Sequence, residues 1–210
     1  MMSLNQKKRP YIHSSSEASI QRSILLFVPR SKSITFDSDM RIYLVGFMGS
    51  GKSSLGQRVA ANLEVPFFDT DSVIEAQAGM TIPEIFETFG ELYFRQVESD
   101  ILRQTTFYQK SLNATGGGLP CFEDNMAWMN VHGVTIYLQW PDPILRDHLV
   151  SIRKSRPLLA SLDDSEASLK INDLLSIRKP IYEQSAITIE LKGDEEGDFK
   201  LLEKACKYIW

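Results

Sequence analysis

The sequence predicts an α/β fold in which helices cover both faces of a five-stranded parallel sheet, and three observations predict it. Short apolar runs alternate with longer amphipathic stretches from residue 40 onward, as expected for repeated strand–helix–strand units. The first apolar run leads directly into a glycine-rich turn and a helical pattern. The length of 210 residues, of which 43% are hydrophobic and 24% charged, suits one compact domain.

The predicted strands are short, apolar and rich in β-branched and aromatic residues. The first is the clearest, because the run from Ile42 to Val45 is continuously apolar and so is typical of a strand buried on both faces. The five predicted strands lie at residues 41–46, 66–69, 111–115, 134–139 and 186–191.

Amphipathic patterns of helical period separate these strands. Thr81 can cap a helix that has Pro83 in its first turn and ends at Gly90. Residues 153–165, which include Pro157 and two consecutive aspartates, are expected to form a loop. The predicted helices lie at residues 51–63, 81–89, 91–106, 123–130, 142–152, 166–184 and 195–208.

Residues 1–39 differ in composition from the rest of the chain. They carry a basic run at residues 7–9 and serines at 14–16, but only one short apolar run, from Ile24 to Val28. We expect a poorly ordered extension before a catalytic domain at 40–210, and a start misassigned upstream of Met40 would explain it. A serine-rich, acid-poor leader also fits an organelle transit peptide, whereas the apolar run is too short for a secretory signal.

Charge and composition exclude several classes of partner. The net charge of −4 argues against a nucleic-acid binder, which needs a basic surface. No apolar run approaches the roughly 20 residues that span a bilayer. Cys121 and Cys206 are too few for a disulfide framework or a zinc site. We therefore expect a soluble cytoplasmic protein that binds small molecules.

Residues 46–53, here named the phosphate loop, match the signature G-x-x-x-x-G-K-[ST] between a predicted strand and a predicted helix. Glycines there let successive N–H groups converge on phosphate oxygens at a helix N-terminus. Lys52 is predicted to reach the β- and γ-phosphates of ATP, and Ser53 to bind the Mg²⁺ that bridges them. The predicted ATP-binding residues of this segment are Gly49, Ser50, Gly51, Lys52, Ser53 and Ser54.

A carboxylate for the metal has to come from a strand other than 111–115, because that strand ends in a threonine and three glycines. Asp69 and Asp71 stand at the carboxyl end of the second predicted strand, where ligands bind in open α/β sheets. Alternation along an extended chain would turn both side chains toward the same side. An isolated Asp-x-Asp also fits a helix N-cap with a solvated neighbour.

Two arginines have ordinary interpretations when each is taken alone. Arg95 and Glu98 are three residues apart on a predicted helix, so they can form a surface salt bridge. Arg178 is by itself a solvated charge on a helix. Neither arginine indicates a ligand without further context.

Six motifs of the sequence gain meaning when they are taken together. They are the phosphate loop, Asp69-Thr70-Asp71, Gly90-Glu91 with Phe94-Arg95 and Glu98, Thr115 to Gly118, Arg156-Pro157-Leu158-Leu159, and Arg178-x-Pro180-x-Tyr182. These motifs resemble those of the shikimate kinase family and stand in the same order. Over residues 40–210 this resemblance implies a three-layer P-loop fold with strand order 2-3-1-4-5 and a mobile lid. It also implies a monomer that transfers phosphate from ATP to the 3-hydroxyl of shikimate, with Mg²⁺ as cofactor, in aromatic amino-acid biosynthesis.

The resemblance implies a role for each matching residue. Asp71 matches the catalytic residue that holds the shikimate hydroxyl groups, and Asp69 matches an outer-shell support for the Mg²⁺ on Ser53. Arg95 and Arg178 match the pair that binds the substrate carboxylate, a role that suits guanidinium groups because they bind carboxylates bidentately. The remaining implied contacts are Glu98, which orients Arg95, Gly117 and Gly118, which approach the ring closely, and the apolar walls Ile82, Phe86 and Phe94.

On the nucleotide side, Arg156 matches the lid arginine, which implies catalytic and ATP-binding contacts. The basic residues Arg146, Arg153 and Lys154 have no clear register with the family, so their roles stay open. The loop 193–198 is acidic where the family commonly has basic residues or proline, which leaves the adenine contacts open. The alternative functions are a gluconate-kinase-like enzyme and a non-catalytic, shikimate-kinase-like binding protein.

Overall fold

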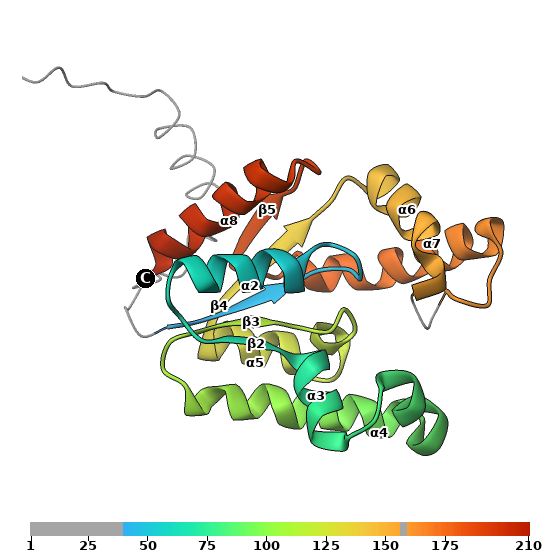
Figure 1. Cartoon of the computed structure of the whole chain (residues 1–210), viewed down its shortest axis with the longest axis horizontal. Helices are drawn as coiled ribbons and strands as arrows, with labels where there is room; N and C mark the ends of the chain where they lie inside the picture. The colour runs from blue at the N-terminus through green and yellow to red at the C-terminus, as the bar shows by residue number, and fades with distance from the viewer. Residues whose placement is uncertain (1–39, 156–158) are drawn as a thin grey trace, which may run out of the picture. The chain divides into compact units, whose positions relative to one another are not determined.

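The computed structural model describes residues 40–155 and 159–210, which contain a five-stranded parallel sheet (Figure 1). The strands run in the order β2-β3-β1-β4-β5, and every neighbouring pair is parallel. This order confirms the predicted topology, and both ends of every strand lie within one residue of the prediction. The strands are β1 (Arg41–Val45), β2 (Phe67–Asp69), β3 (Ser111–Ala114), β4 (Gly133–Gln139) and β5 (Ile187–Glu190).

Helices cover both faces of the sheet and form a core on each (Figure 1). Successive residues of β1 alternate between the two cores, as the strand period requires. Ile42 and Leu44 pack with α2 (Lys52–Asn62) and α8 (Glu195–Ile209). Tyr43 and Val45 pack with α5 (Asn125–His132), α6 (Asp142–Ser151) and α7 (Asp164–Tyr182). The three-layer α/β architecture is therefore confirmed.

A third apolar cluster joins α3 (Thr70–Ala78) to α4 (Ile82–Gln104). The predicted helices do not include α3, although a helix N-cap is one interpretation of Asp69-x-Asp71. Helix α4 is interrupted at Gly90, whose φ of 82° and ψ of 169° are not helical, as the predicted end there requires. Thr81 is the N-cap of α4, and both its N–H and its hydroxyl donate to the carboxylate of Glu84.

The predicted loop at 153–165 is shorter than expected at both ends. It opens with a 3₁₀ turn, η3 (Arg153–Ser155), and α7 begins at Asp164, two residues before the predicted start. The earlier start follows from a capping box, in which Asp163 accepts the N–H of Glu166 and Glu166 accepts the N–H of Asp163. Arg156, the predicted lid arginine, and the leader at 1–39 lie outside the described residues.

Two further short elements and the cysteines complete the described fold. The 3₁₀ turns η1 (Thr105–Phe107) and η2 (Leu119–Cys121) flank β3. Cys121 at the end of η2 is partly exposed, whereas Cys206 in α8 is buried, and both are free thiols. Across residues 40–155 and 159–210, no helix combines the length and apolar character needed to cross a membrane.

Candidate active site

The phosphate loop carries β1 into α2 through three glycines with positive φ. Gly46, Gly49 and Gly51 have φ of 147°, 75° and 83°, conformations that other residues adopt only with strain. Gly51 is the N-cap of α2. The loop therefore ends at a helix N-terminus, where free backbone N–H groups and the helix dipole favour an anion.

Lys52 is folded back into this loop and is only 7% exposed. Its Nζ donates to the carbonyl oxygens of Gly46 at 2.9 Å and Phe47 at 2.8 Å, and to the hydroxyl of Ser50 at 3.4 Å. Carbonyl dipoles thus hold the ammonium group at the position where the signature predicts phosphate. Its charge also reaches the acceptor side of the site, because it lowers the pKa of Asp71.

Asp69 ends β2, caps α3 and contacts the phosphate loop. Its Oδ1 accepts the N–H groups of Asp71 at 3.0 Å and Ser72 at 3.3 Å, and its Oδ2 accepts the hydroxyl of Ser53. The helix-cap interpretation is therefore correct for Asp69, and it coexists with a contact that suits a metal role.

Ser53 and Asp69 fit a site for a hard divalent cation. Hydroxyl and carboxylate oxygens are the ligands that Mg²⁺ prefers, and here the two groups are in direct contact. Within the described residues, no group of three or more His, Cys, Asp and Glu side chains could hold a metal. A cation at Ser53 would therefore need phosphate oxygens and water to complete its coordination, as is usual for Mg²⁺.

Asp71 lies in the first turn of α3, because the chain becomes helical at Thr70. The alternation argument, which treats residues 69–71 as extended, is therefore wrong. Burial raises the pKa of Asp71 to about 6, and Asp69 adds to this increase, while Lys52 lowers the pKa. A carboxylate with this pKa is largely ionised at neutral pH and can accept a proton.

Gly116 brings two carboxylates together. A β-carbon on Gly116 would lie 2.7 Å from Oδ1 of Asp71 and still closer to Oε1 of Glu98. Its N–H donates to the hydroxyl of Thr70 at 2.9 Å, which ties the end of β3 to the start of α3. The absence of a side chain at Gly116 is therefore what allows both carboxylates to reach this point.

Gly117 and Gly118 lie against the two predicted carboxylate-binding arginines. A β-carbon on Gly118 would lie 2.7 Å from Cζ of Arg95, and one on Gly117 would lie 3.7 Å from Nη1 of Arg178. Residues from α3, α4 and α7 thus converge on the three glycines after β3, and the structure brings together the predicted acceptor residues that it describes.

The ion pair between Arg95 and Glu98 is buried, so the interpretation as a surface salt bridge is wrong. Nη1 of Arg95 lies 2.7 Å from Glu98, and Nη2 lies 3.0 Å from Glu91. The Arg95 side chain is 13% exposed and that of Glu98 is 1% exposed. Burial raises the pKa of Glu98 to about 7, and the charge of Arg95 opposes this shift.

Arg178 is also buried, which contradicts the interpretation as a solvated helical charge. It is 9% exposed, and its guanidinium lies 5.7 Å from the ring centre of Phe47. No carboxylate of the described residues lies within 4.0 Å of its guanidinium nitrogens. Its charge lowers the pKa of Glu98, so this carboxylate lies in range without a direct ion pair. A buried cation without a direct ion pair is costly, so this position favours an anionic ligand.

The predicted apolar wall belongs to the cluster between α3 and α4. Phe94 is 4% exposed, and its ring centre lies 4.6 Å from that of Phe86. Ile82 packs against the same cluster. Arg95 lies next to Phe94, with its guanidinium 5.5 Å from the ring centre, so the cluster supports the helix segment that carries this arginine.

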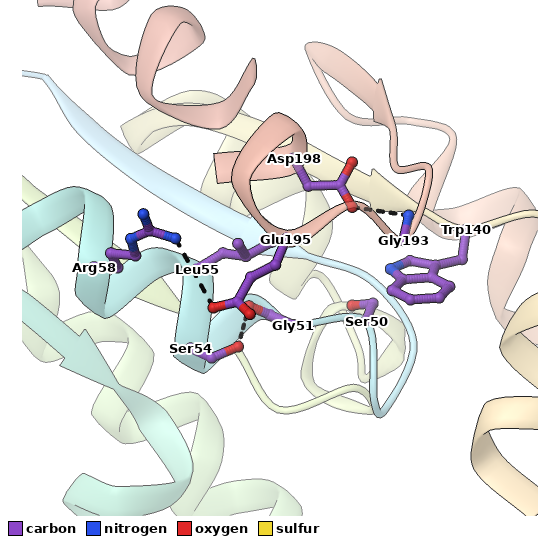
Figure 2. Close-up of a pocket in the computed structure, with 9 residues that line it drawn as sticks. All are labelled: Ser50, Gly51, Ser54, Leu55, Arg58, Trp140, Gly193, Glu195 and Asp198. Atoms are coloured by element: carbon purple, nitrogen blue, oxygen red, sulfur yellow. Dashed lines mark hydrogen bonds and ion pairs between the residues drawn. The ribbon is translucent and has the colours of Figure 1, made fainter. Parts of the chain in front are cut away.

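A pocket of about 190 Å³ adjoins the phosphate loop on the side of α8 (Figure 2). In Figure 2, Arg58 and Glu195 lie on one side of the pocket, and Trp140 lies on the opposite side. Asp198 accepts the N–H groups of Lys192 and Gly193, which fixes the turn between β5 and α8. The pocket is lined by Ser50, Gly51, Ser54, Leu55, Arg58, Trp140, Gly193, Glu195 and Asp198.

Sequence reasoning missed Arg58 and Trp140 as lining residues. Trp140 directly follows β4, so the rule that ligands bind at the carboxyl ends of strands could have indicated it. Arg58 forms an ion pair with Glu196 and lies 4.0 Å from the ring centre of Phe199, and no motif marks these contacts. Arg58 is thus a basic partner for the acidic loop at 193–198.

Comparison with known proteins adds an independent observation. The family model for shikimate kinase matches residues 48–208. The shikimate kinase of Bacteroides fragilis is 38% identical over 146 residues, which cover 70% of this chain and 82% of that protein. The enzyme of the same name from Caldanaerobacter subterraneus is 40% identical over 151 residues, with coverages of 71% and 85%.

Solved structures agree with these sequence relatives. The shikimate kinase structure from Bacteroides thetaiotaomicron has a TM-score of 0.73 and 34% identity, and the match covers 80% of this chain and 98% of that one. The structure of shikimate kinase from Acinetobacter baumannii in complex with shikimate has a TM-score of 0.72 and 35% identity, with coverages of 82% and 96%.

Proposed function

The chain belongs to the shikimate kinase family, and from this premise we propose how its residues transfer phosphate from ATP to the 3-hydroxyl of shikimate. The products are ADP and shikimate 3-phosphate, an intermediate of aromatic amino-acid biosynthesis. The substrates are small molecules, and the acceptor and nucleotide ends of the site lie on either side of the phosphate loop.

The buried charge of Arg178 is the observation that supports the acceptor assignment most strongly. Among the described residues Arg178 forms no ion pair within 4.0 Å, although its charge acts on the nearby Glu98, and shikimate supplies a direct partner in its carboxylate. Arg95 provides a second guanidinium across Gly117 and Gly118, and Glu98 holds it in place. Two oriented guanidinium groups bind a carboxylate with fixed geometry, which also orients the rest of the ring.

At the nucleotide end, the phosphate loop binds the phosphates of ATP through backbone N–H groups at the start of α2. Lys52 exchanges its contacts with the carbonyls of Gly46 and Phe47 for contacts with the β- and γ-phosphates. The pocket beside Trp140 and Gly193 is open to the same loop, so we assign the adenosine moiety to it.

Mg²⁺ is the proposed cofactor, held by the hydroxyl of Ser53 with Asp69 as an outer-shell support. When bound, the cation neutralises charge on the phosphates. Asp69 keeps its orientation through the two N–H groups of α3 that it caps, so its free oxygen stays directed at Ser53.

Asp71 positions the acceptor hydroxyl for direct in-line transfer. A bond forms between the 3-hydroxyl oxygen and the γ-phosphorus as the bond to the bridging oxygen of ADP breaks. The hydroxyl proton passes to Asp71, whose raised pKa suits this role. Because such transition states are loose, orientation by Asp71, Arg95 and Arg178 contributes more than basicity.

Arg156 completes the proposed catalytic set as a residue of the lid. Its position lies outside the described residues, and its role rests on the Arg156-Pro157-Leu158-Leu159 motif. A guanidinium that reaches the transferring phosphate on closure stabilises its charge and excludes water that would hydrolyse ATP. We also propose a cytoplasmic monomer, because the family resemblance implies a monomer and two free thiols suit a reducing compartment.

Shikimate binding by the Arg178→Met variant tests the acceptor assignment. Removing one partner of a buried charge pair typically costs 2–5 kcal/mol, so we expect affinity to fall by roughly a hundredfold in calorimetric titrations. Affinity for ADP should change by less than about twofold, because the contact of Arg178 with the phosphate loop is to the ring of Phe47 and not to the groups that bind phosphate. The matched control is Lys179→Met. It removes the neighbouring cation, which forms an ion pair with Asp142. Equal shikimate affinity in wild type and Arg178→Met would contradict the assignment.

A further inference from the structure

Tyr182 belongs to a motif that the proposed mechanism leaves unused. It ends α7, four residues and so about one helical turn beyond Arg178. The residue is 0% exposed, and its hydroxyl donates to the carbonyl oxygen of Gly117, 65 residues earlier in the chain. One turn of α7 therefore reaches the acceptor glycines twice, through the guanidinium of Arg178 and the hydroxyl of Tyr182.

Gly117 is closely confined between the two halves of the site. A β-carbon on it would lie 3.2 Å from the backbone nitrogen of Met48, 3.6 Å from the carbonyl oxygen of Gly46 and 3.7 Å from Nη1 of Arg178. The residue thus separates the phosphate loop from the arginine that binds the acceptor carboxylate. A small shift of Gly117 would change the position of one relative to the other.

The hydroxyl of Tyr182 is suited to hold Gly117 as a permanent donor. Burial raises the pKa of Tyr182 above its ordinary value, so the group stays protonated at physiological pH. A protonated hydroxyl donates readily to a carbonyl, which can only accept. Cys121 and Arg178 both interact with the same hydroxyl, and α7 packs against η2 around it.

Core packing alone does not require this hydroxyl. The ring of Tyr182 packs against Tyr137 with centroids 5.4 Å apart, and a phenylalanine ring would fill the same space. Tyr137 offers a contrast in the same cluster, because it is 3% exposed but its hydroxyl lies toward Asp142 and Glu183. Burial and then these two charges raise the pKa of Tyr137 to about 12.

We propose that Tyr182 is a positioning residue for the acceptor, whose hydroxyl fixes Gly117 at the spacing from Arg178 that shikimate requires. The inference rests on the proposed function, because it takes Arg178 as the ligand of the shikimate carboxylate. Loss of the hydroxyl leaves a buried carbonyl without its donor and lets Gly117 move relative to Arg178. The effect then falls on acceptor binding rather than on the nucleotide.

Tyr182→Phe and Tyr137→Phe, compared in the full chain, separate this role from packing. Each variant loses one hydroxyl from the same cluster, so a general loosening of the core would affect both alike. We expect Tyr182→Phe to raise the KM for shikimate roughly tenfold, as the loss of a buried hydrogen bond implies. Its kcat should stay within about threefold and its KM for ATP within about twofold, while Tyr137→Phe leaves all three near wild type.

Coupling to Arg178 is the second readout. In an Arg178→Met background, Tyr182→Phe should change the KM for shikimate by less than about twofold, because the guanidinium through which it acts is missing. These outcomes apply when wild type releases ADP in response to shikimate. The proposal is then overturned if Tyr182→Phe leaves the KM for shikimate unchanged, or if Tyr182→Phe and Tyr137→Phe change it equally. A wild type without that response contradicts the proposed function instead.

Gly117→Ala probes the same contact if Tyr182→Phe does not fold. Its methyl group would lie 3.2 Å from the backbone nitrogen of Met48, which is a tight contact, and 3.7 Å from Arg178, which is an ordinary one. Relief of the tight contact moves Gly117 without removing the hydroxyl. We expect the KM for shikimate to rise at least about fivefold. A Gly117→Ala protein with the wild-type KM for shikimate overturns the proposal.

Discussion

At the scale of single residues, the acceptor site depends on glycines that leave room rather than on glycines with unusual backbone angles. Neither Gly116 nor Gly118 has a positive φ, in contrast to the glycines of the phosphate loop. A side chain at Gly116 would displace the carboxylates of Asp71 and Glu98, whereas one at Gly118 would displace Arg95. A side chain at Gly116 therefore acts on Asp71 and, through Glu98, also on Arg95, whereas one at Gly118 acts on Arg95 directly. The effect on Asp71 distinguishes the two positions.

Gly116→Ala and Gly118→Ala should have different kinetic effects. We expect Gly116→Ala to lower kcat roughly tenfold or more, because it moves the group that orients the acceptor hydroxyl. Gly118→Ala should mainly raise the KM for shikimate, since it moves Arg95 and weakens ground-state binding. Steady-state kinetics at saturating ATP measure both effects. Identical changes of kcat and KM in the two variants would contradict the separation of roles.

Glu98 should make the stability of the protein depend on pH. Its pKa is raised from 4.5 to about 7 by burial, so the folded state binds this proton more tightly than the unfolded state. The stabilisation is complete below pH 4.5 and is lost as the pH rises through about 7. The contribution of Glu98 to the free energy of unfolding thus differs by about 3 kcal/mol between the two ends of this pH range.

Urea unfolding of wild type and Glu98→Gln between pH 5 and pH 8 measures this contribution. The free energy of unfolding of wild type, relative to the variant, should fall by roughly 2–3 kcal/mol between pH 5 and pH 8. Asp71 remains in both proteins, so most of its own titration cancels. A difference that stays constant with pH would show that Glu98 does not titrate in this range.

Asp69 shows how a motif can indicate a residue while the local argument for its geometry is wrong. The motif indicated the residue, but strand alternation gave the wrong reason for the proximity of Asp69 and Asp71. Alternation applies only while the chain stays extended, and here the Asp69 carboxylate caps a helix that starts at the next residue. A cap of this kind competes with strand continuation, and sequence period alone does not resolve that competition.

At the scale of elements, α3 was not predictable from its own pattern. The helix spans only nine residues and follows a three-residue strand without a connecting loop. Its clearest signals lie at its ends, in the Asp69 cap and in Gly79, which adopts a left-handed conformation with φ of 63°. Such signals are strong only when a longer periodic pattern lies between them.

The acidic turn before α8 has a structural explanation. Glu195, Glu196 and Asp198 lie in the first turn of the helix, where negative charge interacts favourably with the helix dipole. Asp198 binds the two N–H groups of the preceding turn, and Glu196 pairs with Arg58 of α2. The acidic composition is therefore accounted for by the fold and does not by itself oppose nucleotide binding.

The interruption of α4 at Gly90 leads to a prediction about stability. Its φ of 82° and ψ of 169° lie in a region that only glycine occupies readily, and a β-carbon there would meet no atom within 4 Å. We expect Gly90→Ala to cost about 2–3 kcal/mol from backbone strain alone. Thermal or urea unfolding provides the measurement.

Gly79→Ala is the matched control for this prediction. A β-carbon at Gly79 also meets no atom within 4 Å, but its φ of 63° and ψ of 22° are accessible to alanine at a cost of about 1 kcal/mol. Equal stability losses in the two variants would mean that the backbone at residue 90 relaxes after substitution. The interruption would then not depend on glycine.

At the scale of the whole molecule, the described residues contain every motif in full except Arg156-Pro157-Leu158-Leu159, of which they include Leu159. We propose that residues 40–210 form the catalytic domain. The carbonyl of Met40 accepts the indole N–H of Trp210, and Met40 packs against the core, so the chain is tied to the fold from this residue onward. A protein that begins at Met40 should fold and keep full activity, measured as ADP release. Loss of most activity would place part of residues 1–39 in the domain.

Local patterns predicted the strands and the phosphate loop well, because hydrophobic period and glycine spacing are local properties of the chain. Burial was not predictable in this way. Arg95, Glu98 and Arg178 have ordinary surface interpretations until α4 and α7 are packed against the glycines after β3. The pocket beside Trp140 likewise combines the ends of separate strands and helices, whose proximity follows only from the sheet order.

Release of ADP by the full-length protein with shikimate, with gluconate or with no acceptor tests the central claim most directly. The buried guanidinium pair, the Asp71 carboxylate and the phosphate loop together predict rapid release with shikimate only, matched one to one by shikimate 3-phosphate. Asp71→Asn should abolish most of that release while ADP binding persists, because the phosphate loop lies on another strand. Equal release with gluconate, or release that does not depend on any acceptor, would contradict the account.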